Sequence, residues 1–446
     1  MTETGACLTA PRTERRPNHL WFGAALVVVL VSGGCSTDPE SGSSSETTTT
    51  DAGDATTSST APSDTTRPPD DVEWTHIRLG RDTDANSLSV SALVASPTGL
   101  VAVGDRDGRG TAWLSEDGTT WRRVDFPPVG DREQTSVADV VHDGSQFIAA
   151  GHIGVRPDGS LRTERQRAMV WSSPDGEQWA PIPLDNDEGQ AEQTVTGVAT
   201  DGSRFVVVGL EESPQGAVAW ISDDGESWQH IPIATADGDT TQYVSAIGVT
   251  ATTAGFVTVG SHRGGGSDPD ILPAAWYSPD GIAWSESSVE ATGADLEGME
   301  IVATDSTLLV AKGLLIADMD STSGEGPLVS MWQSLDHGVS WQLMAGPDLH
   351  QLRGGVRGIA VSGTGIALVG ADSPESATFA TAWTTRDGET WHQAPADPEL
   401  FPVGGMVDVV IHQNQLIAIG WVDIYDDEIG VWTTSLRSIN DSFAAP

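Results

Sequence analysis

The chain has 446 residues, with 64 Asp and Glu against 22 Lys and Arg, and a formal net charge of −42 at pH 7. Such a surface repels nucleic acid and anionic lipid headgroups, which excludes nucleic-acid binding and membrane attachment through charge. Hydrophobic residues make up 38% of the chain, enough for a large core.

Residues 1–35 are predicted to be an export signal. A basic stretch precedes the apolar run Leu20–Val31, whose 12 residues are too few to span a bilayer. The run ends in Val31-Ser-Gly-Gly-Cys35, which resembles the bacterial lipobox, although Ser32 stands where that motif prefers leucine. The resemblance implies that Cys35 is acylated and becomes the mature N-terminus. Plain cleavage and an uncleaved anchor are the alternatives. The protein is then expected at the bacterial cell surface, on the outer face of the cytoplasmic membrane, with lipid as its only membrane contact.

Residues 36–72 are Ser, Thr, Asp, Gly and Pro with almost no large apolar side chain, so this segment cannot build a core. A random coil of this length reaches about 35 Å, which makes the segment a flexible tether. Its threonines could carry sugar, which composition alone does not decide. Once Cys7 leaves with the signal and Cys35 carries lipid, no cysteine remains for an internal disulfide.

A nine-residue motif recurs through the rest of the chain, as in Trp220-Ile-Ser-Asp-Asp-Gly-Glu-Ser-Trp228. Alternation before the Asp-Gly turn and a tryptophan after it predict a β-hairpin. Because six copies cannot all reach one site, the turn aspartates are predicted to be structural, each clamping its own turn. They are Asp117, Asp175, Asp224, Asp280, Asp336 and Asp387.

Four short strands surround each motif, and the second of these strands recurs seven times, at residues 100–104, 147–151, 205–209, 256–260, 309–313, 366–370 and 416–420. Repeated four-stranded units predict an all-β protein, a seven-bladed β-propeller of four-stranded antiparallel blades over residues 73–440. The seventh unit lacks its fourth strand. Residues 73–79 resemble the missing strand, and Trp74 is expected to partner Trp432. The ring is therefore predicted to close by an N-terminal strand that completes the last blade.

The motif resembles the Asp-box of the bacterial neuraminidase repeat, found in sialidases and in other propellers. Ser334-Leu-Asp-His-Gly-Val-Ser-Trp341 matches it closely, and the other five copies lack the residue between Asp and Gly. The resemblance covers nearly all of residues 73–437 and implies a propeller without assigning a catalytic residue. Sialidases of this kind have six blades, an arginine triad, a tyrosine nucleophile and an Arg-Ile-Pro segment. This chain has seven predicted blades, no Arg-Ile-Pro, and only Tyr243, Tyr277 and Tyr425 as tyrosines, so sialidase activity is not expected.

Candidate ligand-binding residues fall into two sets. The face opposite the motif turns carries the longer, more varied loops, where binding residues usually sit. Charged residues in these loops are Arg162, Arg165, Arg167, Asp426 and Asp427. The second set lies on the innermost strands near the central channel, where solvated polarity is the alternative explanation. It comprises Asp139, Glu300, Arg357 and Asp408.

Calcium is the only cofactor that the sequence suggests. Asp185, Asp187 and Glu188 could supply some of the six to eight oxygens that calcium needs. In so acidic a chain, such clusters also arise by chance.

Three classes of function remain open at this point. The first is a surface-anchored, monomeric interaction scaffold for a protein or a glycan. The second is a glycoside hydrolase, which needs only two carboxylates about 5 to 9 Å apart. The third is an assembly factor for a membrane complex. Fold alone does not choose among them.

Overall fold

The computed structural model describes residues 73–79, 85, 87–130, 133–155, 165–184, 192–212, 215–235, 243–263, 271–289, 296–303, 309–315, 328–343, 356–362, 365–372, 378–385, 390–422 and 428–436. The chain divides into Met1–Ser63 and Asp64–Pro446, and all described residues belong to the second unit. The predicted export signal, tether and lipidation site therefore lie outside the described residues. Among these residues, no helix has the length and hydrophobicity that crossing a membrane requires.

The described strands form seven sheets, each of which is one blade. Blade 1 contains β2 (Leu88–Ser96), β3 (Gly99–Arg106), β4 (Arg109–Ser115) and β5 (Arg122–Asp125). Blade 2 contains β6 (Glu133–His142), β7 (Phe147–Val155), β8 (Arg165–Ser173) and β9 (Ala180–Pro183). Blade 3 contains β10 (Gln193–Thr200), β11 (Phe205–Glu212), β12 (Gln215–Ser222) and β13 (Gln229–Thr235). Blade 4 contains β14 (Tyr243–Thr252), β15 (Gly255–Arg263), β16 (Ile271–Ser278) and β17 (Ser285–Glu286).

Blade 5 contains β19 (Leu296–Ala303), β20 (Leu309–Leu315), β21 (Leu328–Ser334) and β22 (Ser340–Leu343), with β18 (Ser288–Val289) added at its edge. Blade 6 contains β23 (Val356–Ser362), β24 (Gly365–Asp372), β25 (Phe379–Thr385) and β26 (His392–Gln393). Blade 7 contains β27 (Gly404–His412), β28 (Gln415–Val422) and β29 (Glu428–Ser435). Its fourth strand is β1 (Trp74–Arg78), which precedes blade 1 in the sequence.

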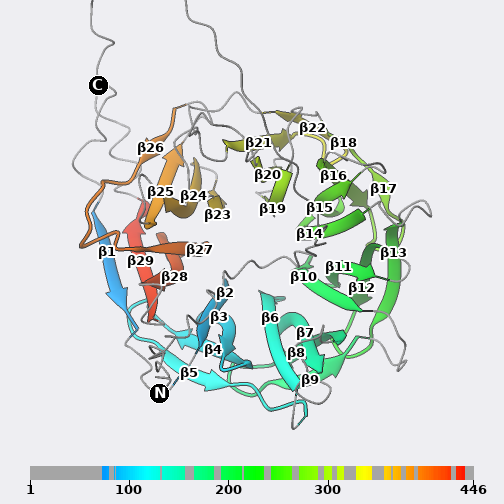
Figure 1. Ribbon diagram of the computed structural model, residues 1–446, viewed down its shortest axis with the longest axis horizontal. Coiled ribbons are helices and arrows are strands. Elements are labelled where there is room, and N and C mark those ends of the chain that lie inside the picture. Colours follow the sequence, from blue (N-terminus) through cyan, green and yellow to red (C-terminus); the bar gives the residue numbers. More distant parts are fainter. Residues whose placement is uncertain are drawn as a thin grey trace, which may run out of the picture. The chain divides into compact units, whose positions relative to one another are not determined.

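The blades close into a ring (Figure 1). The first strand of each blade contacts the first strand of the next, from β2 through β6, β10, β14, β19 and β23 to β27, and β27 contacts β2 again. These first strands surround the centre, and the fourth strands lie on the outside. The predicted seven-bladed β-propeller is confirmed.

The hydrophobic core lies in the seams between blades. Phe205–Leu210 in β11 is buried throughout rather than on alternate residues, because neighbouring blades cover both faces of the sheet. In one seam, Trp220 of blade 3 packs in a cluster with Ile148 and Leu184 of blade 2. Each blade is thus stabilised mainly by its two neighbours.

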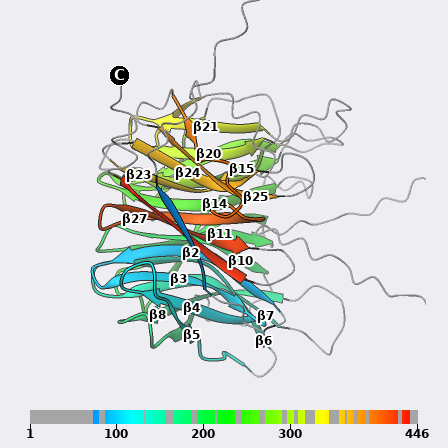
Figure 2. The same cartoon turned by 90° about the vertical axis from the view of Figure 1, so that its left-hand side faces the viewer.

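The register of β1 shows that it completes blade 7. In six blades, the first tryptophan of the motif pairs with a residue of the fourth strand, and the second tryptophan lies two residues before that partner. In blade 3, for example, Trp220 pairs with His230, and Trp228 lies two residues before His230. In blade 7, Trp432 pairs with His76, and Trp74 again stands two residues before. The expected partnership of Trp74 with Trp432 is therefore diagonal, as in every other blade. Figure 2 shows β1 in blue running beside β29 in red.

Blade 5 differs from the expected four strands. After the two-residue strand β17, the chain crosses to the next blade, where β18 pairs with β22 in parallel. The amide of Ser288 donates to the carbonyl of Val339 at 3.1 Å. Because β17 is so short, the chain is free to leave blade 4 early and pair with blade 5.

Each first strand contains one register shift, where one of its residues is skipped in the pairing with the second strand. The glycine that ends each recurring second-strand segment, such as Gly209 in residues 205–209, pairs with a first-strand residue next to this bulge. A side chain at Gly209 would place its Cβ 2.0 Å from the carbonyl oxygen of Thr194 on the first strand. The recurring glycine therefore reflects the close approach of the two backbones.

Candidate functional site

The motif turns are closed by a fixed set of side-chain bonds. In blade 3, the buried Ser222 Oγ accepts from the amide of Gly225 at 2.8 Å and donates to Asp224 Oδ1 at 2.9 Å. Asp224 Oδ1 accepts from the amides of Glu226 and Ser227 at 2.8 and 2.7 Å. The indole of the second tryptophan donates to the carbonyl of the motif glycine in five blades, at Trp121, Trp179, Trp228, Trp284 and Trp341.

These bonds hold the motif aspartates in their ionised form. Backbone N–H donors, that of Ser227 first, lower the pKa of Asp224 to about 2, and those of Thr120 and Thr119 do the same for Asp117. The pKa values of Asp175, Asp280 and Asp336 are also lowered. Carboxylates engaged in this way act as hydrogen-bond acceptors in their own turns. Asp387 lies outside the described residues.

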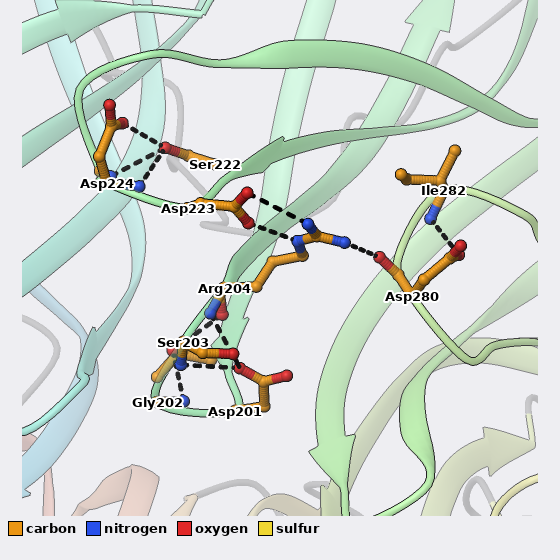
Figure 3. A network of polar contacts seen from close by, with 11 residues as sticks. Asp201, Gly202, Ser203, Arg204, Ser222, Asp223, Asp224, Asp280 and Ile282 are labelled. Atoms are coloured by element: carbon orange, nitrogen blue, oxygen red, sulfur yellow. Dashed lines mark hydrogen bonds and ion pairs between the residues drawn. The ribbon is translucent and has the colours of Figure 1, made fainter.

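Four of the described motif turns, at Gly118, Gly176, Gly225 and Gly281, also meet the preceding blade. A Cβ at Gly225, whose φ is 76°, would come within 3.0 Å of Ile148 Cδ1 in blade 2. Arg204 adds a polar link: it donates to both carboxylate oxygens of Asp223 in its own blade and, at 2.6 Å, to the carbonyl of Asp280 in blade 4 (Figure 3). Hydrogen bonding to Asp223 raises the pKa of Arg204. This face therefore carries contacts that join blades.

Ser222→Ala is expected to lower the free energy of unfolding by about 1–3 kcal/mol, because the buried amide of Gly225 loses its acceptor. Urea unfolding measures the loss. Ser203→Ala is the matched control, because the Ser203 hydroxyl donates to Asp201, an exposed residue in the turn between β10 and β11. Equal losses in both variants would contradict the role assigned to the buried hydroxyl.

Two of the channel candidates bond to the backbone of the adjacent blade. Asp139 Oδ2 accepts from the amide of Val198 in blade 3 at 2.9 Å, and Asp408 Oδ2 accepts from the amide of Leu93 in blade 1 at 2.7 Å. In both residues, Oδ1 accepts from the next amide along the chain at 2.7 Å. Each carboxylate stands directly after the bulge and joins two first strands. The geometry thus gives Asp139 and Asp408 a structural role at the seams.

The remaining candidates are placed only in part. Arg357 is exposed and is the extra residue of the β23 bulge, and Arg167 is exposed on β8. Glu300 and Arg165 lie on β19 and β8, with side chains that are not described. Arg162, Asp426, Asp427 and the predicted calcium ligands Asp185, Asp187 and Glu188 lie outside the described residues. Within the described ranges, no group of three or more His, Cys, Asp or Glu side chains has a metal-binding arrangement.

A pocket that the sequence did not single out lies on the second-to-third loop face of blade 1. It has a volume of about 320 Å³ and is lined by Arg106, Asp107, Arg109 and Asp125. The Asp107-Gly108 turn, with φ values of 51° and 72°, brings the two arginines together. The one sequence signal was a pair of basic residues around a turn in a strongly acidic chain. Asp125 could not be added from sequence, because β5 brings it to the pocket.

Asp105 lies beside this pocket in sequence but faces blade 2. The residue is 6% exposed, and its carboxyl accepts from the amide of Val137 at 3.2 Å. Burial raises its pKa to about 8. Asp105 is thus a buried acid that holds its proton at neutral pH.

No known protein family and no curated protein matches the chain. Among solved structures, a PL25 ulvan lyase bound to -[GlcA(1-4)Rha3S]- aligns with a TM-score of 0.51 at 11% identity, over 83% of this chain and 99% of that one. The phage phi92 endosialidase aligns at 0.47 and 12% identity, over 82% and 69%. The Trypanosoma rangeli sialidase aligns at 0.45 and 12% identity, over 82% and 60%. At these identities the likeness concerns the fold alone: the chain is a seven-bladed β-propeller whose structural neighbours are sialidase-like and polysaccharide-lyase propellers.

Proposed function

We propose that the protein is a surface-anchored binding scaffold whose second-to-third loop face holds a glycan. The observation that carries the proposal is the pocket of about 320 Å³ in that face, lined by guanidinium and carboxylate groups. Charged and hydrogen-bonding side chains around a concave site fix the orientation of a polar ligand. The opposite face supports this assignment, because its aspartates are engaged in turn and seam bonds.

The fold is compatible with this role. One structural neighbour is described as bound to a saccharide, the ulvan lyase with -[GlcA(1-4)Rha3S]-. The glycoside hydrolase and the assembly factor remain alternatives, and a protein ligand is the alternative to a glycan. Fold similarity by itself does not separate them.

The test is a glycan array and a protein pull-down with the full chain, with hydrolysis of the bound glycans monitored in parallel. A scaffold retains a glycan without cleaving it. Release of reducing sugar would identify a hydrolase, and capture of a membrane complex without glycan binding would favour the assembly role.

Anchoring depends on Cys35 in this proposal, because two or three acyl chains on one cysteine give stable membrane attachment that a single chain does not. Cys35→Ser is expected to release or mislocalise the protein and to leave it without the mass of the lipid. Fractionation and intact mass spectrometry measure both effects. A variant that stays in the membrane fraction with unchanged detergent partitioning would contradict lipidation at this residue.

A further inference from the structure

Two arginines face each other across the β3–β4 hairpin. Arg106 and Arg109 are the last pair of the ladder, so their side chains project from the same face of the sheet. Leu100 and Trp113 lie on that same face by alternation and pack in the seam with blade 7. Like charges directly opposite in a sheet are destabilising. This pair therefore needs negative charge nearby.

Within the described ranges, a carboxylate pairs with Arg106 but none pairs with Arg109. Arg106 Nη1 lies 3.6 Å from Asp107 Oδ2, and Asp125 Oδ1 lies 3.4 Å from Arg123 Nε. Arg109 is exposed, and its guanidinium forms no ion pair with any carboxylate of the described ranges. In a chain with a formal charge of −42, a guanidinium left over at a pocket points to a ligand that brings its own anion.

The backbone around the pocket is fixed from both sides. Asp107 donates its amide to the carbonyl of Ser87 at 3.0 Å and accepts from the amide of Ser87 at 3.2 Å. The carbonyl of Gly108 accepts from the amide of Thr135 in blade 2 at 2.9 Å. A turn held in this way spares a ligand the entropic cost of ordering it.

We propose that this pocket binds one acidic sugar unit, which names the ligand class of the proposed function and rests on it. The sugar carboxylate lies between Arg106 and Arg109, whose planar guanidinium groups match carboxylate geometry. Sugar hydroxyls donate to the carboxylates of Asp107 and Asp125. A bare anion would be repelled by those two carboxylates, and a neutral sugar would leave Arg109 without a carboxylate partner. The volume of about 320 Å³ is near the lower limit for ligand sites, about 300 Å³, which suits one unit of a chain.

Isothermal titration of the full chain with methyl glucuronide, methyl glucoside and sodium sulfate tests the proposal. The glucuronide is expected to bind saturably and more tightly than the glucoside and the sulfate. Arg109→Gln is expected to weaken glucuronide binding about tenfold to a hundredfold, the usual effect of losing a charge-assisted hydrogen bond. Arg122→Gln is the matched control on the same blade. Its guanidinium pairs with the exposed Glu177, and its loss should leave the affinity unchanged.

Three results would overturn the assignment: no saturable glucuronide binding, sulfate binding as tightly as glucuronide, or an Arg109→Gln variant with unchanged affinity. The glycan array separates this failure from failure of the scaffold. A glycan that binds equally well to the unchanged chain and to Arg109→Gln leaves the scaffold function standing and removes the acidic-sugar site. If no glycan on the array binds and the titration shows no glucuronide binding, both the scaffold function and the acidic-sugar site are contradicted.

Discussion

A chain that begins at Asp82 is expected to unfold at a clearly lower temperature and to aggregate more readily than one that begins at Asp70. The shorter chain lacks β1, so β29 becomes an open edge of blade 7. It also loses Trp74, which is 5% exposed and packs against Phe401 at 5.5 Å between ring centroids. Removing a buried tryptophan alone typically costs about 3–5 kcal/mol.

The chain beginning at Asp70 is the control, because it lacks the signal and most of the tether but keeps β1. Scanning calorimetry and light scattering compare the two. Trp74→Ala provides a second measurement if the shorter chain does not fold, and it should lower stability while β1 keeps its place in the ladder. If the two shortened chains have the same melting temperature, β1 has no role in closing the ring.

The fold was predictable because its signal is repeated. The Asp-Gly turn, the paired tryptophans and the second-strand glycine each return at a regular spacing, and each reflects a local contact: a turn bond, a packed seam or a close backbone approach. Even closure by β1 followed from the same pattern. Sequence periodicity thus determines blade number and order in this molecule.

The candidate site was much less predictable, because it depends on contacts between distant residues. The carboxylates of Asp139 and Asp408, which were predicted from sequence as channel candidates, accept hydrogen bonds from amides 59 and 315 residues away. Arg109 and Asp125 meet only because β4 and β5 pair. β18 was unexpected for the same reason, since its partner β22 belongs to another blade. The spacing of residues along the sequence does not predict such long-range contacts.

The pH dependence of stability follows from two groups of aspartates with opposite shifts. The motif aspartates have lowered pKa values in the folded state, so the stability they contribute is present above the unfolded value of 3.8 and is lost as pH falls towards 2. Asp105 acts in the other direction. In the unfolded chain it releases its proton near 3.8, whereas the folded chain keeps the proton until about pH 8.

Between pH 4 and 8 the unfolded state therefore binds fewer protons at Asp105, and the free energy of unfolding is expected to fall as pH rises, by up to a few kcal/mol. Asp105→Asn should abolish this slope and be more stable than the unchanged chain at pH 8, because the amide oxygen still accepts from Val137 and carries no charge. Urea unfolding at pH 5, 6, 7 and 8 measures the slope. Asp125→Asn, which removes an exposed carboxylate of the same blade, should keep it. If Asp105→Asn shows the same slope as Asp125→Asn, another group is responsible, and Asp105 is ionised in the folded protein at neutral pH.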